Sequence, residues 1–226
     1  MEETLSITIA ATYEKLGKLD EHTEQIWLVC HGFGQLAKFF IRRFDILDPE
    51  KNLVIAPQGL SKFYLNGQYE KVGASWLTRE NREIDLANVL IYLDAIYESE
   101  IKLHFENPKI IENIKANKLK INILGFSQGV SKICRWAVAC QIPFDKLVLW
   151  AGRFPNEIHQ EQLDFIKPDV EILLVVGNKD EYYQETYIEE EKQKLTDLIK
   201  PPKIIIFEGI HEVRRDVLEK IIDYKD

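Results

Sequence analysis

The stretch Ile121-Asn122-Ile123-Leu124-Gly125-Phe126-Ser127-Gln128-Gly129-Val130 joins an apolar run to a serine flanked by glycines. The apolar run at 121–124 is typical of a strand buried on both faces of a sheet, and helical spacing follows the serine. A strand-to-helix turn of the pattern G-x-S-x-G holds its serine in a strained conformation at the carboxyl edge of the sheet. We therefore predict that Ser127 is a nucleophile, with an ordinary turn as the alternative.

Apolar runs of the same kind recur along the chain and alternate with segments of helical spacing. This alternation from residue 26 onward predicts an α/β protein with a mostly parallel, doubly wound sheet and helices on both faces. The segment 5–13 instead alternates apolar and polar residues, which predicts a strand near a sheet edge. The predicted buried strands are 26–30, 53–56, 121–124, 147–151, 172–176 and 204–207, and the predicted helices are 82–97, 130–139, 187–199 and 213–222.

Length and composition predict one cytoplasmic domain spanning residues 1–226. The 29 basic and 37 acidic residues give 29 − 37 = −8, a net charge that disfavours binding to nucleic acid. Three cysteines indicate a reducing compartment, and the acidic start of the chain is unlike a signal peptide. No apolar run reaches the length of about 18 residues that a membrane span needs. The sequence leaves the oligomeric state open.

A nucleophilic serine needs a histidine base and an acid that orients it. After a G-x-S-x-G turn the acid and then the histidine follow in chain order. Asp180 is the first carboxylate after the apolar run 172–176, and His211 follows the run 204–207. We predict Asp180 as the acid and His211 as the base. Glu181 is the alternative acid, while a turn-forming Asp180 and a His211 that only begins a helix are the readings without catalysis.

An oxyanion hole needs two backbone N–H donors. One normally belongs to the residue after the nucleophile, which is Gln128 here. The loop His31-Gly32-Phe33-Gly34 follows another apolar run, and its glycines allow an unusual turn. We predict that the Phe33 amide is the second donor and that His31 is a structural residue of this loop.

The loop at 31–34, the motif at 125–129, Asp180 after Gly177, and Gly209-Ile210-His211-Glu212 together resemble the phospholipase/carboxylesterase family. This is the acyl-protein-thioesterase-like branch of the α/β-hydrolases, and the similarity covers nearly the whole chain. It implies a compact α/β-hydrolase with no large cap domain that cleaves small carboxylic esters or thioesters without a cofactor. The chain departs from the family at Phe33, Gln35 and Ile210, where Leu, Asp and Gly are common. The resemblance therefore does not imply which ester or thioester the chain prefers.

Aromatic residues near the predicted site suggest how the substrate is bound. We predict that Phe33, Tyr64, Trp76 and Tyr182, together with Tyr183, wall the site and favour short-to-medium acyl chains. Most of these rings lie in the aperiodic segment 57–80 or on the loops of Phe33 and Asp180. Packing of the loops against the sheet is the alternative reading of the same rings.

Other kinds of chemistry lack support in the sequence. No histidine pair or Cys-x-x-Cys has the spacing of a metal site, and no phosphate-binding loop is present. We expect Cys30, Cys134 and Cys140 to be small core residues and Ser131 to be an ordinary helix residue. A peptidase or lactone hydrolase on the same fold is the alternative enzyme, and a non-catalytic binding module is the alternative class.

Overall fold

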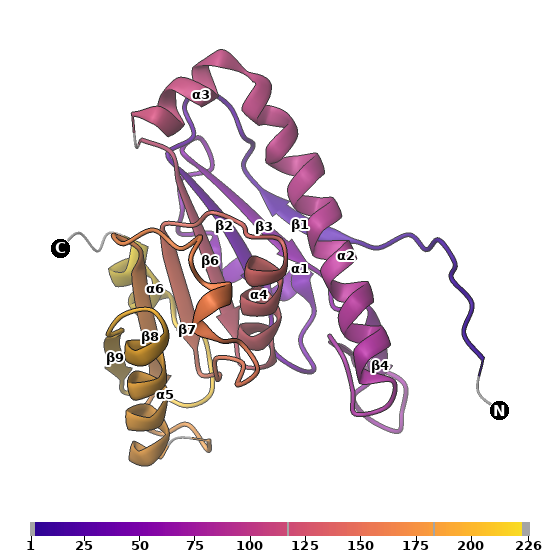
Figure 1. The fold of residues 1–226 in the computed structure, drawn as a ribbon. Coiled ribbons are helices and arrows are strands. Elements are labelled where there is room, and N and C mark those ends of the chain that lie inside the picture. The colour runs from indigo at the N-terminus through magenta and orange to yellow at the C-terminus, as the bar shows by residue number, and fades with distance from the viewer. Residues whose placement is uncertain (1–2, 117, 183, 223–226) are drawn as a thin grey trace.

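A seven-stranded sheet forms the centre of the computed structural model, which describes residues 3–116, 118–182 and 184–222 (Figure 1). The strand order is β1-β3-β2-β6-β7-β8-β9, and each pairing is parallel except the one between β1 and β3. The predicted mostly parallel sheet is confirmed. The strands are β1 (Tyr13–Leu16), β2 (Gln25–Cys30), β3 (Asn52–Pro57), β6 (Lys120–Phe126), β7 (Lys146–Trp150), β8 (Glu171–Gly177) and β9 (Lys203–Phe207).

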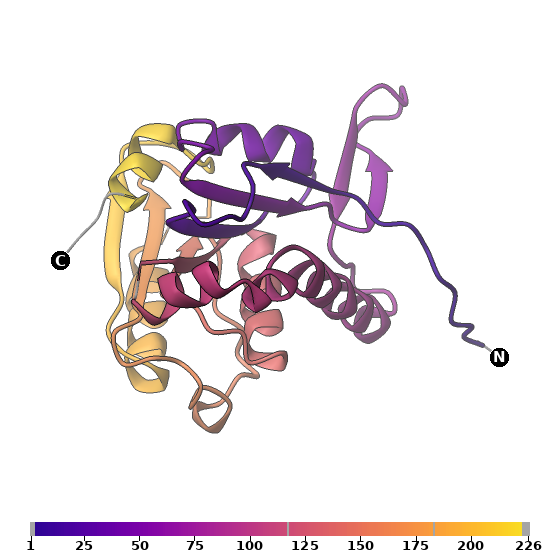
Figure 2. The ribbon, with the colours of Figure 1, turned by 90° about the horizontal axis from the view of Figure 1, so that it is seen from above.

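Helices cover both faces of this sheet (Figure 2). One face packs against α2 (Arg82–Glu100), α3 (Pro108–Lys115), α4 (Gln128–Ala139) and α5 (Glu185–Leu198). The other face packs against α1 (Ala37–Phe40), the 3-10 turn Ile41–Phe44 and α6 (Arg215–Ile222). Two further 3-10 turns are Lys102–Glu106 and Gln160–Gln162. Within the described residues, no helix is both long enough and apolar enough to cross a membrane.

The continuous apolar runs arise because both faces of the central strands are covered. In β2, the side chains of Ile26, Leu28 and Cys30 belong to the core beneath α2 and α4, while Trp27 and Val29 belong to the core beneath α1 and α6. All five residues are fully or almost fully buried. A strand between two layers has no polar face, so its sequence does not alternate.

The N-terminal prediction is partly wrong. The strand at this edge is β1, from Tyr13 to Leu16, and the segment 5–12 is extended chain that runs away from the sheet in both views (Figures 1 and 2). Leu5, Ile7 and Ile9 are exposed. The alternating pattern fits an extended backbone, but a strand also needs a neighbour for its hydrogen bonds, and the segment 5–11 has no such partner among the described residues.

The aperiodic segment 57–80 contains a second, two-stranded sheet that the sequence does not reveal. Its strands are β4 (Ser61–Tyr64) and β5 (Val72–Ser75), which pair antiparallel and stand away from the main sheet (Figure 2). The strands are only four residues long, so neither contains a full alternating pattern. This hairpin places the residues from Phe63 to Trp76 beside the carboxyl edge of the main sheet.

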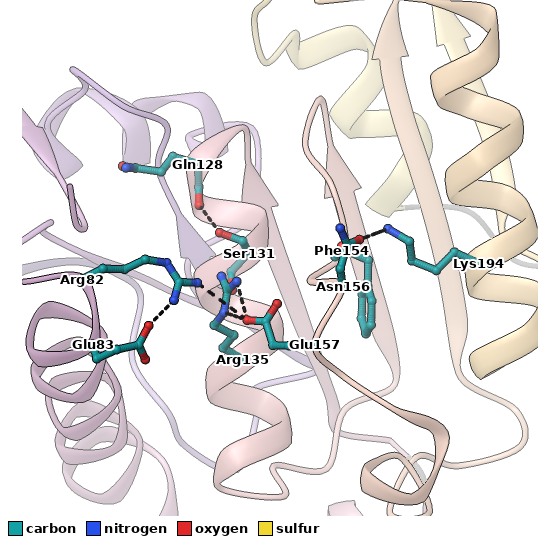
Figure 3. A network of polar contacts seen from close by, with 9 residues as sticks. All are labelled: Arg82, Glu83, Gln128, Ser131, Arg135, Phe154, Asn156, Glu157 and Lys194. Atoms are coloured by element: carbon teal, nitrogen blue, oxygen red, sulfur yellow. Dashed lines mark hydrogen bonds and ion pairs between the residues drawn. The ribbon is translucent and has the colours of Figure 1, made fainter. Parts of the chain in front are cut away.

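Ion pairs and hydrogen bonds connect the segment after β7 to the surrounding helices (Figure 3). Glu157 accepts a 2.6 Å hydrogen bond from Arg135 of α4 and lies 3.8 Å from Arg82 of α2. Lys194 of α5 donates to Asn156 at 2.7 Å. The first of these contacts attaches the segment after β7 to α4, the helix that carries the serine motif at its N-terminus, and the second attaches it to α5.

Candidate active site

Ser127 lies on the turn between β6 and α4 in a conformation that few L-residues adopt. Its φ is 53° and its ψ is −117°, and it is the N-cap residue of α4. Its amide donates to the carbonyl of Trp150 on the neighbouring strand at 2.8 Å. Such backbone strain persists only where the surrounding structure holds it, and it is common at functional sites. The predicted strand–turn–helix context of the serine is therefore present.

Three glycines make this turn possible because they lie where a side chain has no room. A Cβ at Gly125 would stand 2.3 Å from the Val130 Cα, and one at Gly129 would stand 2.2 Å from the Cys30 carbonyl oxygen. Gly152, on the neighbouring loop, has only 2.4 Å between such a Cβ and the Ser127 carbonyl oxygen. The sequence indicates the first two glycines through the motif, but Gly152 lies outside any motif.

Asp180 and His211 meet above the ends of β8 and β9. The His211 Nδ1 lies 2.6 Å from the Asp180 Oδ2, and the Tyr182 amide donates to Oδ1 at 2.8 Å. The Asp180 side chain is 1% exposed and that of His211 is 21% exposed. Glu181 is exposed, and within the described residues it makes no hydrogen bond or ion pair with His211. The structure thus brings Asp180, and not its neighbour, to the histidine.

The two loops approach closely because of Gly177. A Cβ at this position would lie 2.3 Å from the Gly209 carbonyl oxygen. The Lys179 amide donates to that same carbonyl at 2.8 Å and fixes one loop to the other. Any side chain at 177 would push the loops apart and lengthen the contact between acid and histidine.

His211 lies next to the serine turn. Its ring packs on Phe126, the residue before Ser127, with a centroid distance of 4.8 Å. On the other side the exposed Tyr182 ring stands edge-on at 5.0 Å. Because Nδ1 is bound to Asp180, Nε2 is the nitrogen left for proton transfer. The Ser127 hydroxyl makes no side-chain hydrogen bond to the described part of the chain, so it is available to that nitrogen.

His31 holds the loop at 31–34 and has a structural place, as predicted. It is fully buried; its Nδ1–H donates to the Gly32 carbonyl at 2.8 Å, and its Nε2 accepts from the Gly59 amide at 2.9 Å. Burial lowers the pKa of His31 to about 4, so the ring is neutral at physiological pH. The indole of Trp76 packs on the ring at 4.9 Å and donates to the His31 carbonyl at 2.8 Å.

The backbone amides of Phe33 and Gln128 face no acceptor among the described residues. Gly32 brings the loop of Phe33 close to the serine, because a Cβ on Gly32 would lie 3.3 Å from the Ser127 Cβ. Gln35, where the resembling family commonly has Asp, accepts a hydrogen bond from the Gly32 amide at 2.9 Å and so fixes this turn. Two unengaged N–H groups are what an oxyanion hole requires.

The side chain of Gln128 has a role that sequence reasoning missed. Its amide group donates to the Leu77 carbonyl at 3.0 Å and to the Ser75 hydroxyl at 3.1 Å, and its oxygen accepts from the Trp76 amide at 3.1 Å. These bonds attach the hairpin of β4 and β5 to the N-terminus of α4. In Figure 3 this side chain points away from the Glu157 ion pairs.

The match to known proteins agrees with this geometry. The family model described as Serine hydrolase (FSH1) matches residues 22–216. The chain belongs to this family of serine hydrolases. A search of curated proteins finds no match.

Solved structures similar to this hydrolase cover almost its whole length. They include acyl-protein thioesterase 2 of Zea mays (TM-score 0.62, 13% identity, 94% of this chain and 96% of that chain). A phospholipase/carboxylesterase of Dyadobacter fermentans has a TM-score of 0.60 at 16% identity and covers 96% of both chains. A carboxylesterase of Mesorhizobium loti has a TM-score of 0.65 at 13% identity and covers 94% of both chains. These matches confirm the predicted α/β-hydrolase fold and resemblance.

The predicted substrate-binding residues of the hydrolase occupy two different environments. Phe33 is 61% exposed, Tyr64 53% and Tyr182 67%. Phe33 and Tyr182 lie on the loops of the candidate oxyanion hole and of Asp180, whereas Tyr64 is the last residue of β4 in the hairpin. Trp76 is only 1% exposed and lies beneath the loop of His31. The Phe33 ring packs on Phe63 of the hairpin at 5.1 Å. Tyr183, also predicted to wall the site, lies outside the described residues.

Two cavities adjoin the Asp180–His211 pair, one lined by His211 and the other by Asp180. The larger, of about 670 Å³, is bounded by His211, by residues 34–43 and by the hairpin of β4 and β5. The smaller, of about 110 Å³, is bounded by Asp180, Tyr182 and Gly152. The larger cavity is the one with room for a substituent of several carbon atoms.

Of the three cysteines, two lie in the core as expected, while Cys140 is half-buried and packs against the edge of the core. Cys30 and Cys134 are buried, and burial raises the pKa of both thiols, which keeps them protonated. Ser131 donates to the Gln128 carbonyl at 3.1 Å within α4, as an ordinary helix residue does. In the described part of the chain, no cluster of His, Cys, Asp or Glu has the arrangement of a metal site.

Proposed function

We propose that this serine hydrolase cleaves carboxylic esters or thioesters of short-to-medium acyl chains through an acyl-enzyme on Ser127. The observation that carries the proposal is the 2.6 Å contact between Asp180 and His211 beside the positive-φ Ser127. A serine, a histidine and an acid in this chain order on this fold are typical of acyl transfer. The three residues act as nucleophile, base and orienting acid.

In the first step Ser127 Oγ attacks the carbonyl carbon, and its proton passes to the His211 Nε2. Asp180 holds the imidazole by Nδ1 and stabilises the imidazolium that forms. The carbonyl oxygen becomes an oxyanion and accepts hydrogen bonds from the amides of Phe33 and Gln128. Each such donor contributes about 3–4 kcal/mol to stabilising the transition state in comparable enzymes.

The tetrahedral intermediate then collapses, and the bond from carbon to the leaving oxygen or sulfur breaks. His211 gives its proton to the departing alkoxide or thiolate, and the acyl group stays on Ser127. A water molecule, deprotonated by His211, attacks the acyl-enzyme in the same way. The acid is released, the proton returns to Ser127, and the enzyme is regenerated without a cofactor.

The rings around Ser127 support the proposed preference for short-to-medium acyl chains. Phe33, Tyr64 and Tyr182 are exposed, and we propose that they stand at the mouth of the site, where they contact an acyl chain and limit its length. Each methylene that they cover contributes about 0.8 kcal/mol. Because Trp76 is buried, we assign it the support of the loop and leave contact with substrate to the other three rings. We also propose that residues 1–226 form one catalytic domain and that it acts in the cytoplasm, where three free cysteines remain reduced.

Labelling with a fluorophosphonate probe tests the nucleophile directly. Wild-type protein should react at Ser127, and Ser127→Ala should not react at all. Ser131→Ala, one helical turn further on, is the matched control and should be labelled like the wild type. Labelling at another residue, or none in the wild type, would overturn the assignment.

A panel of p-nitrophenyl esters from acetate to palmitate, with thioesters beside it, tests the reaction. We expect turnover that peaks at short or medium chains and disappears in Ser127→Ala. A kcat/KM that climbs steadily to palmitate would contradict the predicted chain length. Turnover of lactones or peptides without turnover of esters would point to the alternative enzymes.

A further inference from the structure

The larger cavity beside His211 has walls of an unusual composition. Phe39, Leu65 and Val72 are apolar and largely exposed, and they stand around the opening. Lys38, Arg43 and Lys71 line the same cavity, and Lys38 and Lys71 directly precede Phe39 and Val72 in the sequence. The Lys38 ammonium stands 4.9 Å from the centre of the Phe39 ring. The cavity therefore offers apolar surface and positive charge side by side.

These cations have no carboxylate partner within ion-pair distance in the described part of the chain. Other arginines of this chain do have a carboxylate partner: Arg215 is paired with Asp45 at 2.6 Å and Arg214 with Asp216 at 2.8 Å. The acidic groups that face the cavity are Glu70, beside Lys71, and Glu212, beside His211. Three positive and two negative side chains give a net charge of 3 − 2 = +1 in a chain whose total is −8. A positive cavity in an acidic protein attracts anions locally.

The position of the cavity relative to His211 indicates which part of a substrate it accepts. In the proposed reaction His211 gives its proton to the leaving group, so that group must lie against the imidazole. His211 lines the cavity, whereas Ser127 and Asp180 do not. A chain that extends from the leaving oxygen or sulfur past His211 enters this space, while the acyl group remains under the rings of Phe33 and Tyr64.

The geometry points to a substrate whose leaving group carries an anionic substituent. The leaving alcohol or thiol would have a short apolar stem, covered by Phe39, Leu65 and Val72. Its carboxylate, sulfonate or phosphate would lie among Lys38, Arg43 and Lys71. Glu212, next to His211, disfavours an anion close to the reacting atoms, so the charge belongs at the far end of the stem. This inference rests on the proposed function and names the class of substrate for that same site.

Three S-acetyl thioesters that differ in the charge of the thiol test the inference. The thiols are 2-mercaptoethanesulfonate (anionic), N-acetylcysteamine (neutral) and thiocholine (cationic), and each is detected on release with a disulfide reagent. Because the acyl group is the same, all three pass through the same acetyl-enzyme, and kcat/KM reports recognition of the leaving group. We expect the anionic thioester to exceed the neutral one by about tenfold at low ionic strength, and the cationic one to be the poorest. Salt at about 0.5 M should remove most of the difference.

Two triple variants separate the cavity from the total charge of the protein. In Lys38→Gln/Arg43→Gln/Lys71→Gln the ratio of anionic to neutral kcat/KM should fall about tenfold, and this comparison cancels any difference in the intrinsic reactivity of the thioesters. The matched control changes three exposed lysines that do not line the cavity, and it should keep the wild-type ratio. These control substitutions are Lys62→Gln, Lys115→Gln and Lys118→Gln.

The outcomes separate this inference from the proposed function. Thioester hydrolysis with no dependence on thiol charge, or an equal loss in both triple variants, overturns the anionic leaving group and leaves the hydrolase assignment intact. A preference that follows charge on the acyl group, measured with p-nitrophenyl hemisuccinate against p-nitrophenyl butyrate, overturns the placement of the cavity on the leaving-group side. No hydrolysis of any ester or thioester, with Ser127 inert to fluorophosphonate, overturns both.

Discussion

Replacing Asp180 with Asn tests how the structure sets the proton on His211. The carboxylate has two partners, the Tyr182 amide on Oδ1 at 2.8 Å and the His211 Nδ1 on Oδ2 at 2.6 Å. An Asn would keep its single oxygen on the Tyr182 amide, because that N–H needs an acceptor, and would turn its NH2 group toward His211. Nδ1 must then accept a hydrogen bond. The proton moves to Nε2, the nitrogen that has to be free to deprotonate Ser127.

The size of the effect follows from the interactions that are lost. To act as a base in the Asn variant, His211 must carry a proton on Nδ1, which would then face the NH2 group of Asn, a second donor. The imidazolium would also form beside a neutral amide instead of a carboxylate. A hydrogen bond to a charged group contributes about 1.5–3 kcal/mol. The attraction between imidazolium and carboxylate contributes about 4 kcal/mol at an effective dielectric constant near 20. Because the two contributions overlap, we expect a total of about 5 kcal/mol, which lowers kcat by about 10³–10⁴.

The assay compares kcat for p-nitrophenyl acetate in the wild type, Asp180→Asn and Asp180→Ala. Alanine removes the charge but leaves the proton of His211 free to choose either nitrogen, so its kcat should lie above that of the Asn variant. Glu181→Gln changes an exposed neighbouring carboxylate and should keep the wild-type kcat. Thermal unfolding should show that all variants fold. The reasoning would be refuted by an Asn variant within tenfold of the wild type, or by equal kcat values for Asn and Ala.

Four further predictions concern other parts of the molecule. Gly152→Ala should lower kcat by about 100-fold or more because its Cβ would stand 2.4 Å from the Ser127 carbonyl oxygen, whereas Gly67→Ala, with nothing within 4 Å, should be neutral. Burial lowers the pKa of His31 to about 4, so the free energy of unfolding should fall by about 3 kcal/mol as the pH falls from about 6.5 to 4. In His31→Gln, urea unfolding across this range should no longer show the uptake of about one proton on unfolding that causes this fall. Burial lowers the pKa of Lys132 to about 8, so the free energy of unfolding should rise as the pH rises from about 8 to 10.5. Lys132→Met should raise the free energy of unfolding near neutral pH by about 1–3 kcal/mol and should not show this increase with pH. Phe33→Ala should move the optimum of the p-nitrophenyl ester series toward longer chains, and an unchanged optimum would show that its ring only packs on the hairpin.

The parts of the fold that the sequence predicts are those governed by local pattern and burial. The central strands carry continuous apolar runs because both faces are covered, and the structure places each predicted run on a strand. The extended segment 5–12 was wrong as a strand because pairing depends on a neighbour, which a local pattern cannot show. The short hairpin of β4 and β5 was missed because four residues are too few for a period to be recognised.

The candidate site follows the same division. Ser127, Asp180 and His211 each follow an apolar strand, so the carboxyl edge of a parallel sheet brings their loops together. The side chain of Gln128 was missed because its partners, the residues from Ser75 to Leu77, lie about 50 positions earlier in the chain. Gly152 could not be predicted because the atom that excludes a side chain there, the Ser127 carbonyl oxygen, belongs to a different loop. Contacts of this kind exist only in three dimensions.

The sheet order has a consequence for the newly made polypeptide. The serine turn follows β6 at the centre of the sheet, but His211 follows β9, which lies at one edge and pairs with β8 alone in the described sheet. During synthesis the chain emerges from its N-terminus, so the central strands can associate while the segment after residue 200 is still inside the ribosome. Until the segment with His211 docks, the nascent chain holds the proposed nucleophile without its proposed base. We therefore expect hydrolysis to begin only after the segment that carries His211 has emerged and docked, and ribosome-stalled chains ending before His211 to be inert toward esters.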